Sequence, residues 1–327
     1  MAVFVALALI AVGLWSLARA EAPPTPATSD AASRQSMPAA PEEEGTTLAD
    51  QLAPPERAAA LITGEFPVDL PTEDREDPTG PVPLIVISAV GRSDQGRRRK
   101  HNEDALLVSD EHGLYAVADG MGGYAAGEVA SQLAVDTLIH AFATGVFGGA
   151  AIEGLPRRGD ELVRAIQTAN TAILEQARAN EAQSGMGTTI VAARFSPYRQ
   201  RVYIAHVGDS RAYRLRRGEL TQLTADHTLG AAGMTGPSAS KLSRAVGVFD
   251  EVEVDLQVDE PLAGDIYLLC SDGLSKMVPE PDIQRIVVQE RQLSALADRL
   301  VAEANARGGR DNVSVIVVRV DAPGADA

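Results

Sequence analysis

The sequence predicts an α+β domain of four layers, in which two antiparallel sheets form a central β-sandwich and helices flank it on both sides (α-β-β-α). Two helical segments follow the first strands, and two more precede the last strand. A run of short strands joined by tight turns lies between these two pairs. Since strands and helices come in groups, the order does not fit the regular alternation of a parallel sheet.

Short apolar runs that end at turn residues predict the strands. They cover residues 84–90, 105–108, 114–118, 188–195, 201–207, 212–215, 220–223, 252–258, 266–270 and 313–320. Apolar residues that recur at helical spacing predict the helices. They cover residues 124–142, 160–180, 280–290 and 293–306, and Asp160 is the expected N-cap of the second.

The chain divides into three parts. We expect residues 1–20 to be a hydrophobic anchor or signal segment, because they are almost entirely apolar. Residues 21–83 are acidic and rich in Pro and Ala, with few large apolar side chains, which predicts a disordered linker. Residues 84–322 carry all the strong strand and helix signals, and we expect them to form one catalytic domain, as a monomer.

Two membrane interpretations compete for the first segment. Arg19 follows the apolar run and no Lys or Arg precedes it, which favours a single anchor in the cell membrane with a cytoplasmic catalytic domain. The small-residue site Ala18-Arg19-Ala20 fits instead a cleaved signal and a secreted or periplasmic protein.

The charge balance excludes one class of partner. The chain has 29 basic and 45 acidic side chains, a net charge of −16. Residues 1–81 hold 4 basic and 13 acidic side chains, which gives −9 and leaves −7 for the remainder. Because phosphate backbones need a basic stripe, we expect no nucleic-acid partner.

Four aspartates lie at the ends of predicted strands. Asp119 and Asp272 each follow an apolar strand and precede a glycine, whereas Asp104 and Asp311 stand at the entrance to strands. A carboxylate in such a place is costly unless it is solvated or paired with a cation. Oxygen ligands without nearby Cys or His pairs favour Mg²⁺ or Mn²⁺ over zinc. Each aspartate alone fits a turn, and only the set predicts a metal centre.

This centre would suit hydrolysis of a phosphate ester. Two divalent ions bridged by a carboxylate can hold a hydroxide in line with a phosphoryl group and neutralise the developing charge. The site also needs a cation for the phosphate, and a guanidinium fits phosphate oxygens. Arg99 is the candidate, since it stands three residues before Asn102-Glu103-Asp104. Arg97 and Arg98 are expected in a solvated basic turn.

Six motifs follow one another across residues 86–320. They are Arg99-Lys100-His101-Asn102-Glu103-Asp104; Ala118-Asp119-Gly120-Met121-Gly122-Gly123 with Gly127-Glu128-Val129-Ala130-Ser131; Gly185-Met186-Gly187-Thr188-Thr189; His206-Val207-Gly208-Asp209-Ser210-Arg211; Ser271-Asp272-Gly273; and Arg310-Asp311-Asn312. In order and content they resemble the motifs of the metal-dependent protein phosphatases (PPM, or type-2C), in the bacterial form. Each motif alone is weak, and the ordered set is specific.

The resemblance implies an activity and its cofactors. It implies a protein serine/threonine phosphatase that hydrolyses phosphoserine and phosphothreonine with two Mn²⁺ or Mg²⁺ ions per domain. Its partners would be phosphorylated proteins, the substrates of serine/threonine kinases, whose signalling it would reverse. The implied ligands are Asp119 as the bridge, Asp104 with the Gly120 carbonyl on one ion, and Asp272 with Asp311 on the other.

The resemblance also implies roles beyond these ligands. Glu103 would act through metal-bound water, and Arg99 would hold the substrate phosphate, so Arg99, Asp119 and Asp272 are the expected catalytic residues. Asp209 has two interpretations. With Asp272 it matches the ligands of a third, weaker metal ion, and within Gly208-Asp209-Ser210 it fits a turn.

Two departures from the family pattern stand out. Met121 follows Asp119-Gly120 where many members have a histidine, which leaves the general acid unassigned. His227 is a candidate proton donor, although a structural histidine is the interpretation that its sequence favours. The stretch 229–243 is shorter than the usual flap and rich in Gly, Ala and Ser, which predicts a mobile loop and leaves substrate choice open.

Two other functions compete with the phosphatase. A catalytically inactive sensor or scaffold of the same fold is opposed by the presence of every core acid. A metal-dependent nuclease or phosphodiesterase is opposed by the acidic composition and by the lack of a glycine loop in the strand-turn-helix context that cradles nucleotides.

Overall fold

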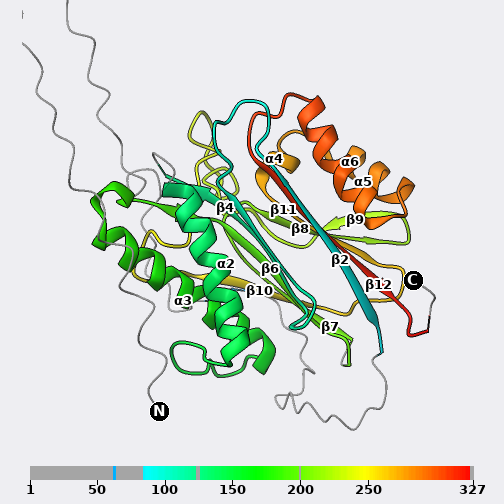
Figure 1. The fold of residues 1–327 in the computed structure, drawn as a ribbon, viewed down its shortest axis with the longest axis horizontal. Coiled ribbons are helices and arrows are strands. Elements are labelled where there is room, and N and C mark those ends of the chain that lie inside the picture. Colours follow the sequence, from blue (N-terminus) through cyan, green and yellow to red (C-terminus); the bar gives the residue numbers. More distant parts are fainter. Residues whose placement is uncertain (1–61, 64–83, 123–125, 199, 325–327) are drawn as a thin grey trace, which may run out of the picture. The chain divides into compact units, whose positions relative to one another are not determined.

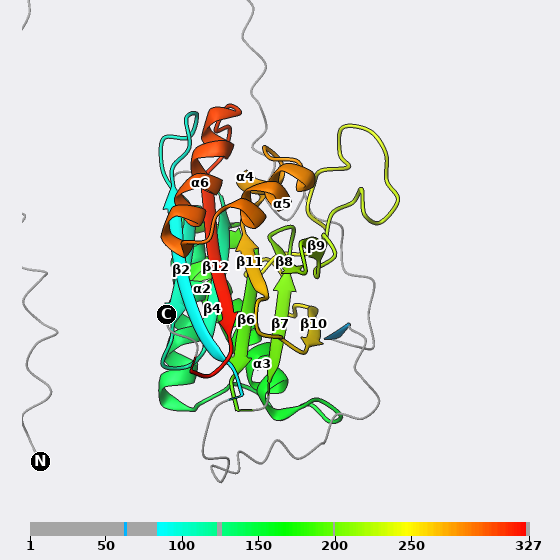
Figure 2. The ribbon, with the colours of Figure 1, turned by 90° about the vertical axis from the view of Figure 1, so that its right-hand side faces the viewer.

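The computed structural model describes residues 62–63, 84–122, 126–198 and 200–324, all within one compact unit, Gly45–Ala327. The expected anchor at 1–20 and nearly all of the expected linker lie outside the described residues. Two sheets stack face to face, and pairs of helices cover the two outer faces (Figure 1). Figure 2 shows the same layers from the side.

The first sheet has the strand order β1-β10-β7-β6-β4-β3, with β5 paired to β4. Its pairs are antiparallel, except that β1 runs parallel to β10. The strands are β1 (Ile62–Thr63), β3 (Asp104–Ser109), β4 (Leu114–Met121), β5 (Gly187–Thr188), β6 (Ile190–Ser196), β7 (Arg201–Val207) and β10 (Val254–Asp259).

The second sheet has the order β2-β12-β11-β8-β9 and is antiparallel throughout. Its strands are β2 (Val86–Asp94), β8 (Arg211–Arg216), β9 (Glu219–Gln222), β11 (Ile266–Cys270) and β12 (Val313–Asp321). The long pairing of β2 with β12 joins the beginning and the end of the domain.

Each outer face is covered by a pair of helices. α2 (Ala126–Thr144) and α3 (Arg157–Ala179) bury their apolar stripes on the first sheet. α5 (Glu280–Gln289) and α6 (Leu293–Ala306) do so on the second. The short helices η1 (Glu181–Gln183) and α4 (Asp272–Ser275) complete the described elements. The predicted four-layer α+β sandwich is therefore confirmed.

A core between the two sheets fixes their relative position. Phe195 on the first sheet packs edge-on against Tyr115, at 5.8 Å between ring centroids, and against Tyr267 of the second sheet, at 5.3 Å. All three side chains are at most 1% exposed. Such close packing leaves little freedom for one sheet to slide on the other, so the strand ends are held at set distances.

Several boundaries differ from those expected. The helix expected at 160–180 begins at Arg157, after Pro156. The expectation that Asp160 caps this helix was therefore wrong. Its carboxylate lies inside the first turn, where it accepts from the Ile152 amide at 2.8 Å and pairs with Arg164 at 3.1 Å.

Within the described part of the chain, no helix is long and apolar enough to cross a membrane.

Candidate metal centre

The ends of four strands meet at one edge of the sandwich. Asp104, at the start of β3, lies directly opposite Asp119 on β4 in the antiparallel register. Asp272 follows β11, and Asp311 precedes β12, the antiparallel neighbour of β11. Since one antiparallel strand ends where its neighbour starts, both pairs of aspartates reach the same edge. Asp119, Asp272 and Asp311 line one cavity of about 210 Å³.

The electrostatics tie Asp104 to the same group. Burial, together with the charges of Asp272 and Asp311, raises the pKa of Asp104 to about 7. Burial first, and then the charge of Asp104 and the other acids, raises the pKa of Asp119 well above its ordinary value. All four sequence-predicted aspartates are thus close enough to repel one another.

The donor set fits hard divalent cations. One carboxylate oxygen of Asp104 and one of Asp272 are buried and have no hydrogen-bond partner among the described residues. The other oxygen of Asp104 accepts from the Ser271 hydroxyl at 2.8 Å. Buried polar atoms are nearly always paired, and Mg²⁺ and Mn²⁺ prefer such oxygen ligands. Cations at these unpaired oxygens would relieve both the repulsion and the missing contacts.

Arg99 and Glu103 lie beside the aspartates, as the sequence predicts. Arg99 Nη2 donates to Asp311 Oδ2 at 2.8 Å, and its Nη1 lies 3.8 Å from Glu103 Oε2. The hydrogen bond to Asp311 raises the pKa of Arg99, while burial raises the pKa of Glu103 against the opposing charge of Arg99. The Arg99 side chain is 48% exposed. A partly exposed guanidinium held in place by carboxylates suits the capture of a phosphate from solvent.

Asn312 fixes the loop that carries Arg99, a role the sequence did not predict. Its amide nitrogen donates to the carbonyl oxygens of Gln95 and His101, both at 2.8 Å. Its side-chain oxygen accepts from the Glu103 amide, also at 2.8 Å. One side chain directly before β12 therefore holds both ends of the loop between β2 and β3. Its position directly after Asp311 was the available signal.

The end of β4 and the start of α2 cross at two glycines. A Cβ on Gly120 would lie 2.0 Å from the Gly127 carbonyl oxygen, and one on Gly127 would lie 2.9 Å from the Gly120 carbonyl carbon. No side chain fits at either position. This close approach lets the Gly120 amide donate to the Glu103 carbonyl at 3.1 Å and brings Gly120 to the cavity wall.

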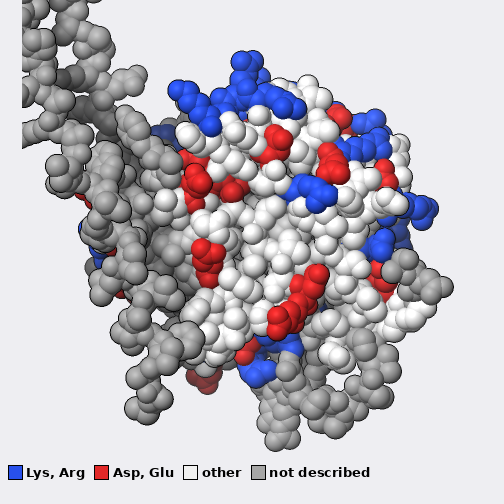
Figure 3. Space-filling model, in the orientation of Figure 1, with Lys and Arg blue, Asp and Glu red and all other residues white. Residues whose placement is uncertain are grey.

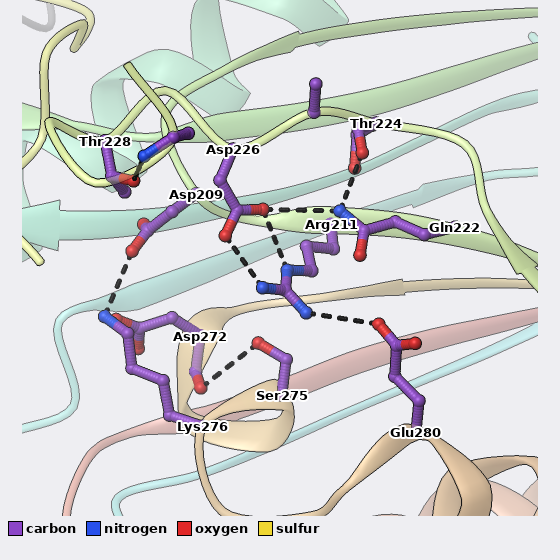
Figure 4. Close-up of polar contacts among 12 residues, drawn as sticks. Asp209, Arg211, Gln222, Thr224, Asp226, Thr228, Asp272, Ser275, Lys276 and Glu280 are labelled. Atoms are coloured by element: carbon purple, nitrogen blue, oxygen red, sulfur yellow. Dashed lines mark hydrogen bonds and ion pairs between the residues drawn. The ribbon is translucent and has the colours of Figure 1, made fainter. Parts of the chain in front are cut away.

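Asp209 reaches the same cavity from the turn between β7 and β8. It is 5% exposed, and Lys276 Nζ lies 3.0 Å from its Oδ2. The same ammonium pairs with Asp272, so that Lys276 stands between the two carboxylates (Figure 4). Sequence reasoning missed Lys276, although its position four residues after Asp272 is one helical turn away.

A bidentate ion pair supports the Asp209 turn. Arg211 donates to both oxygens of Asp226, at 2.8 and 2.7 Å (Figure 4). The next residue, His227, accepts from the Gly208 amide through Nδ1 at 3.1 Å and lies 3.2 Å from Asp255. His227 is buried and is absent from the described lining of the cavity, which supports the structural interpretation of this histidine.

The loop at 229–243 forms one wall of the cavity through Ser240 and Leu242. Its base is paired, since the Leu229 amide donates to the Lys241 carbonyl at 2.8 Å and the Gly230 amide donates to the Ala239 carbonyl at 2.7 Å. In Figure 2 this yellow-green loop projects away from the sheets.

Basic side chains gather next to the site. Arg97, Arg98, Lys100 and Arg310 are exposed and have no ion-pair partner within the described residues. Figure 3 shows the corresponding cluster of Lys and Arg at the end of the domain that carries the β2–β3 and α6–β12 loops. The expectation of a solvated basic turn at Arg97 and Arg98 agrees with this exposure.

Comparisons with known proteins match most of the described domain. Residues 91–310 match the family model of protein phosphatase 2C. The serine/threonine phosphatase stp of Listeria monocytogenes is 41% identical over 246 residues, which is 70% of this chain and 94% of that protein. The serine/threonine protein phosphatase PstP of Mycobacterium tuberculosis is 38% identical over 250 residues, which is 72% of this chain and 45% of that protein.

Solved structures of serine/threonine phosphatases also resemble this chain. The catalytic domain of PstP, solved in complex with two manganese ions, is 40% identical and superimposes with a TM-score of 0.63 over 72% of this chain and 99% of that one. A serine/threonine phosphatase from S. agalactiae is 33% identical, with a TM-score of 0.64 over 72% of this chain and 100% of that one. The chain therefore belongs to the protein phosphatase 2C family, and the predicted enzyme class, a protein serine/threonine phosphatase, is confirmed.

Proposed function

We propose that the domain hydrolyses phosphoserine and phosphothreonine in proteins at a centre of two Mn²⁺ or Mg²⁺ ions. The observation that carries the proposal is the convergence of strand-end aspartates, with unpaired buried oxygens on Asp104 and Asp272, beside the guanidinium of Arg99. The two manganese ions in the solved PstP domain support the number and kind of ion.

The charge of the cluster supports two ions. Among the described residues, six carboxylates surround the site, and Arg99 and Lys276 are the side-chain cations that pair with them. The carboxylates are Glu103, Asp104, Asp119, Asp209, Asp272 and Asp311. Four negative charges thus remain, and two divalent ions neutralise them. The substrate phosphate then arrives at a neutral centre and not at an acidic one.

Each residue has a defined task in this proposal. Asp119 would hold both ions, Asp104 and the Gly120 carbonyl would hold one, and Asp272 and Asp311 would hold the other. When bound, the ions supply an activated water and offset the charge on the transferred phosphoryl group. Glu103 orients water at the same centre. Arg99 keeps one N–H on Asp311 and has further N–H groups for the phosphate oxygens, which fixes the substrate for in-line attack.

Phosphorylated proteins are the proposed substrates. The exposed basic side chains around Arg99 favour a negatively charged, phosphorylated segment, while the acidic remainder of the domain repels other polyanions. Removal of phosphate from serine and threonine would reverse the action of serine/threonine kinases, which is the proposed role in signalling.

Residues 1–20 are proposed to anchor this domain in the cell membrane, with the domain in the cytoplasm. The apolar run and the Arg19 that follows it support this orientation. We expect a reporter fused to the C-terminus to be active only on the cytoplasmic side, and N-terminal sequencing of the protein from cells to start upstream of Glu21. A mature N-terminus at Glu21 would show a cleaved signal instead.

Loss of a bridging or terminal ligand should abolish catalysis. Removal of groups that only support metal ligands costs roughly 10- to 100-fold, so Asp119→Asn and Asp272→Asn should each lower kcat/KM by more than this. The measurement is Mn²⁺-dependent hydrolysis of p-nitrophenyl phosphate and of a phosphothreonine peptide. Asp298→Asn, at an exposed ion pair on α6, is the matched control and should stay at the wild-type level. Full activity in both site variants would contradict the proposed centre.

Arg99→Lys should weaken substrate binding while the charge is kept. A lysine lacks the fork that contacts two phosphate oxygens at once, and one charge-assisted hydrogen bond is worth about 1.5–3 kcal/mol. We expect KM for the phosphopeptide to rise roughly 10-fold or more. Arg98→Lys, the same change at an exposed neighbour, should leave KM within a factor of about two. Equal KM values for the two variants would show that Arg99 does not bind the substrate phosphate.

The effect of Asp104→Asn on the free energy of unfolding should change sign between metal-free and metal-loaded protein. In chelator, the wild-type fold must keep a carboxylate whose pKa is raised to about 7. That penalty grows as pH rises from the unfolded pKa, about 3.9, to the folded one. An asparagine side chain has no charge to desolvate, so the variant should be more stable than the wild type, and more so at pH 8 than at pH 5. In saturating Mn²⁺ the wild type should be the more stable. Urea unfolding in chelator and in saturating Mn²⁺, each at pH 5 and pH 8, measures the stability of both proteins. A variant that is less stable than the wild type in chelator at pH 8 would contradict the assignment.

A further inference from the structure

Lys276 places a permanent positive charge inside the acidic cluster. It follows α4, and its amide donates to the Asp272 carbonyl at 2.8 Å. This turn of helix puts its side chain on the same face as the Asp272 carboxylate. Its ammonium pairs with both Asp272 and Asp209, and it lines the cavity with them (Figure 4).

Asp209 depends on this lysine. Its side chain is 6% exposed, and within the described residues Lys276 is the only cationic side chain that pairs with it. A buried carboxylate without a cation is costly, so either Lys276 or a metal ion has to fill the position between Asp209 and Asp272.

We propose that the Lys276 ammonium takes the place of a third divalent ion between Asp209 and Asp272, so that this enzyme works with two metal ions. The inference rests on the proposed two-ion centre. A cation already joins the two carboxylates that a third ion would need. With two divalent ions and Lys276 in place the cluster is neutral, and a third divalent ion would leave it positively charged.

The ammonium acts as a fixed charge and not as a proton donor. Its Nζ lies 3.0 Å from Asp209 Oδ2 and also pairs with Asp272. An ammonium held between two carboxylates keeps its proton near neutral pH. Its side chain is 51% exposed, so that truncation removes the charge and its contacts without opening the core.

The experiment counts metal ions on the full-length chain in detergent, after removal of bound metal with chelator. Mn²⁺ is titrated by isothermal titration calorimetry, and the bound ions are counted independently by electron paramagnetic resonance of free Mn²⁺. We expect two ions on the wild type and three on Lys276→Ala. Lys276→Arg, which keeps the cation, should stay at two. Lys276→Ala combined with Asp209→Asn should return to two, because the third ion loses its second carboxylate.

The matched control is Lys241→Ala, which removes an exposed lysine without an ion pair within the described residues and should leave two ions. Thermal unfolding followed by circular dichroism checks that each variant is folded. Three ions on the wild type, or two on folded Lys276→Ala, would overturn the assignment of Lys276. Fewer than two ions on the wild type would overturn the two-ion centre as well, so the two failures are distinguishable.

Discussion

Repulsion between buried carboxylates is the constraint on which the site depends. Antiparallel pairing forces Asp104 to face Asp119, and the two sheets bring Asp272 and Asp311 to the same edge. In the absence of metal, burial first and then this repulsion raises the pKa values of Asp104 and Asp119. The inter-sheet core prevents the strands from moving apart to relieve it. Bound cations can therefore relieve the repulsion between these carboxylates, and the fold leaves oxygen atoms free to bind them.

The groups that hold the ligands in place are mostly neutral. Asn312 ties the Arg99 loop to the second sheet through three hydrogen bonds, and Ser271 donates to Asp104. Gly120 and Gly127 let two backbone segments touch. Neutral supports add no further charge to an acidic cluster, and they fix the Asp104 carboxylate and the loop that carries Arg99 before a cation binds. The preorganisation of the centre thus comes from backbone geometry and amides.

The sequence was most informative where a residue breaks a local rule. Aspartates at the ends of apolar strands are unfavourable alone, and this identified Asp104, Asp119, Asp272 and Asp311 together with the layered fold. Groups that obey local rules gave no such signal. Lys276 resembles any exposed lysine until the fold brings the β7–β8 turn to it, because its contact with Asp209 spans 67 positions. The start of α3 was missed for a similar reason. The hydrogen-bond partners of Asp160 are decided by the buried residues around it and not by its place at the start of the apolar pattern.

Chemistry and selectivity are carried by different parts of this fold. The strand ends supply the carboxylates, and their positions follow from sheet pairing, so they have little freedom to vary. The loop at 229–243 contributes Ser240 and Leu242 to the cavity wall, and the β2–β3 loop surrounds Arg99 with exposed basic side chains. The loop at 229–243 and the exposed basic side chains of the β2–β3 loop can change without disturbing the sheets, because neither is part of the inter-sheet core. The loops are therefore the places where the surroundings of the cavity can differ while the sheets stay the same.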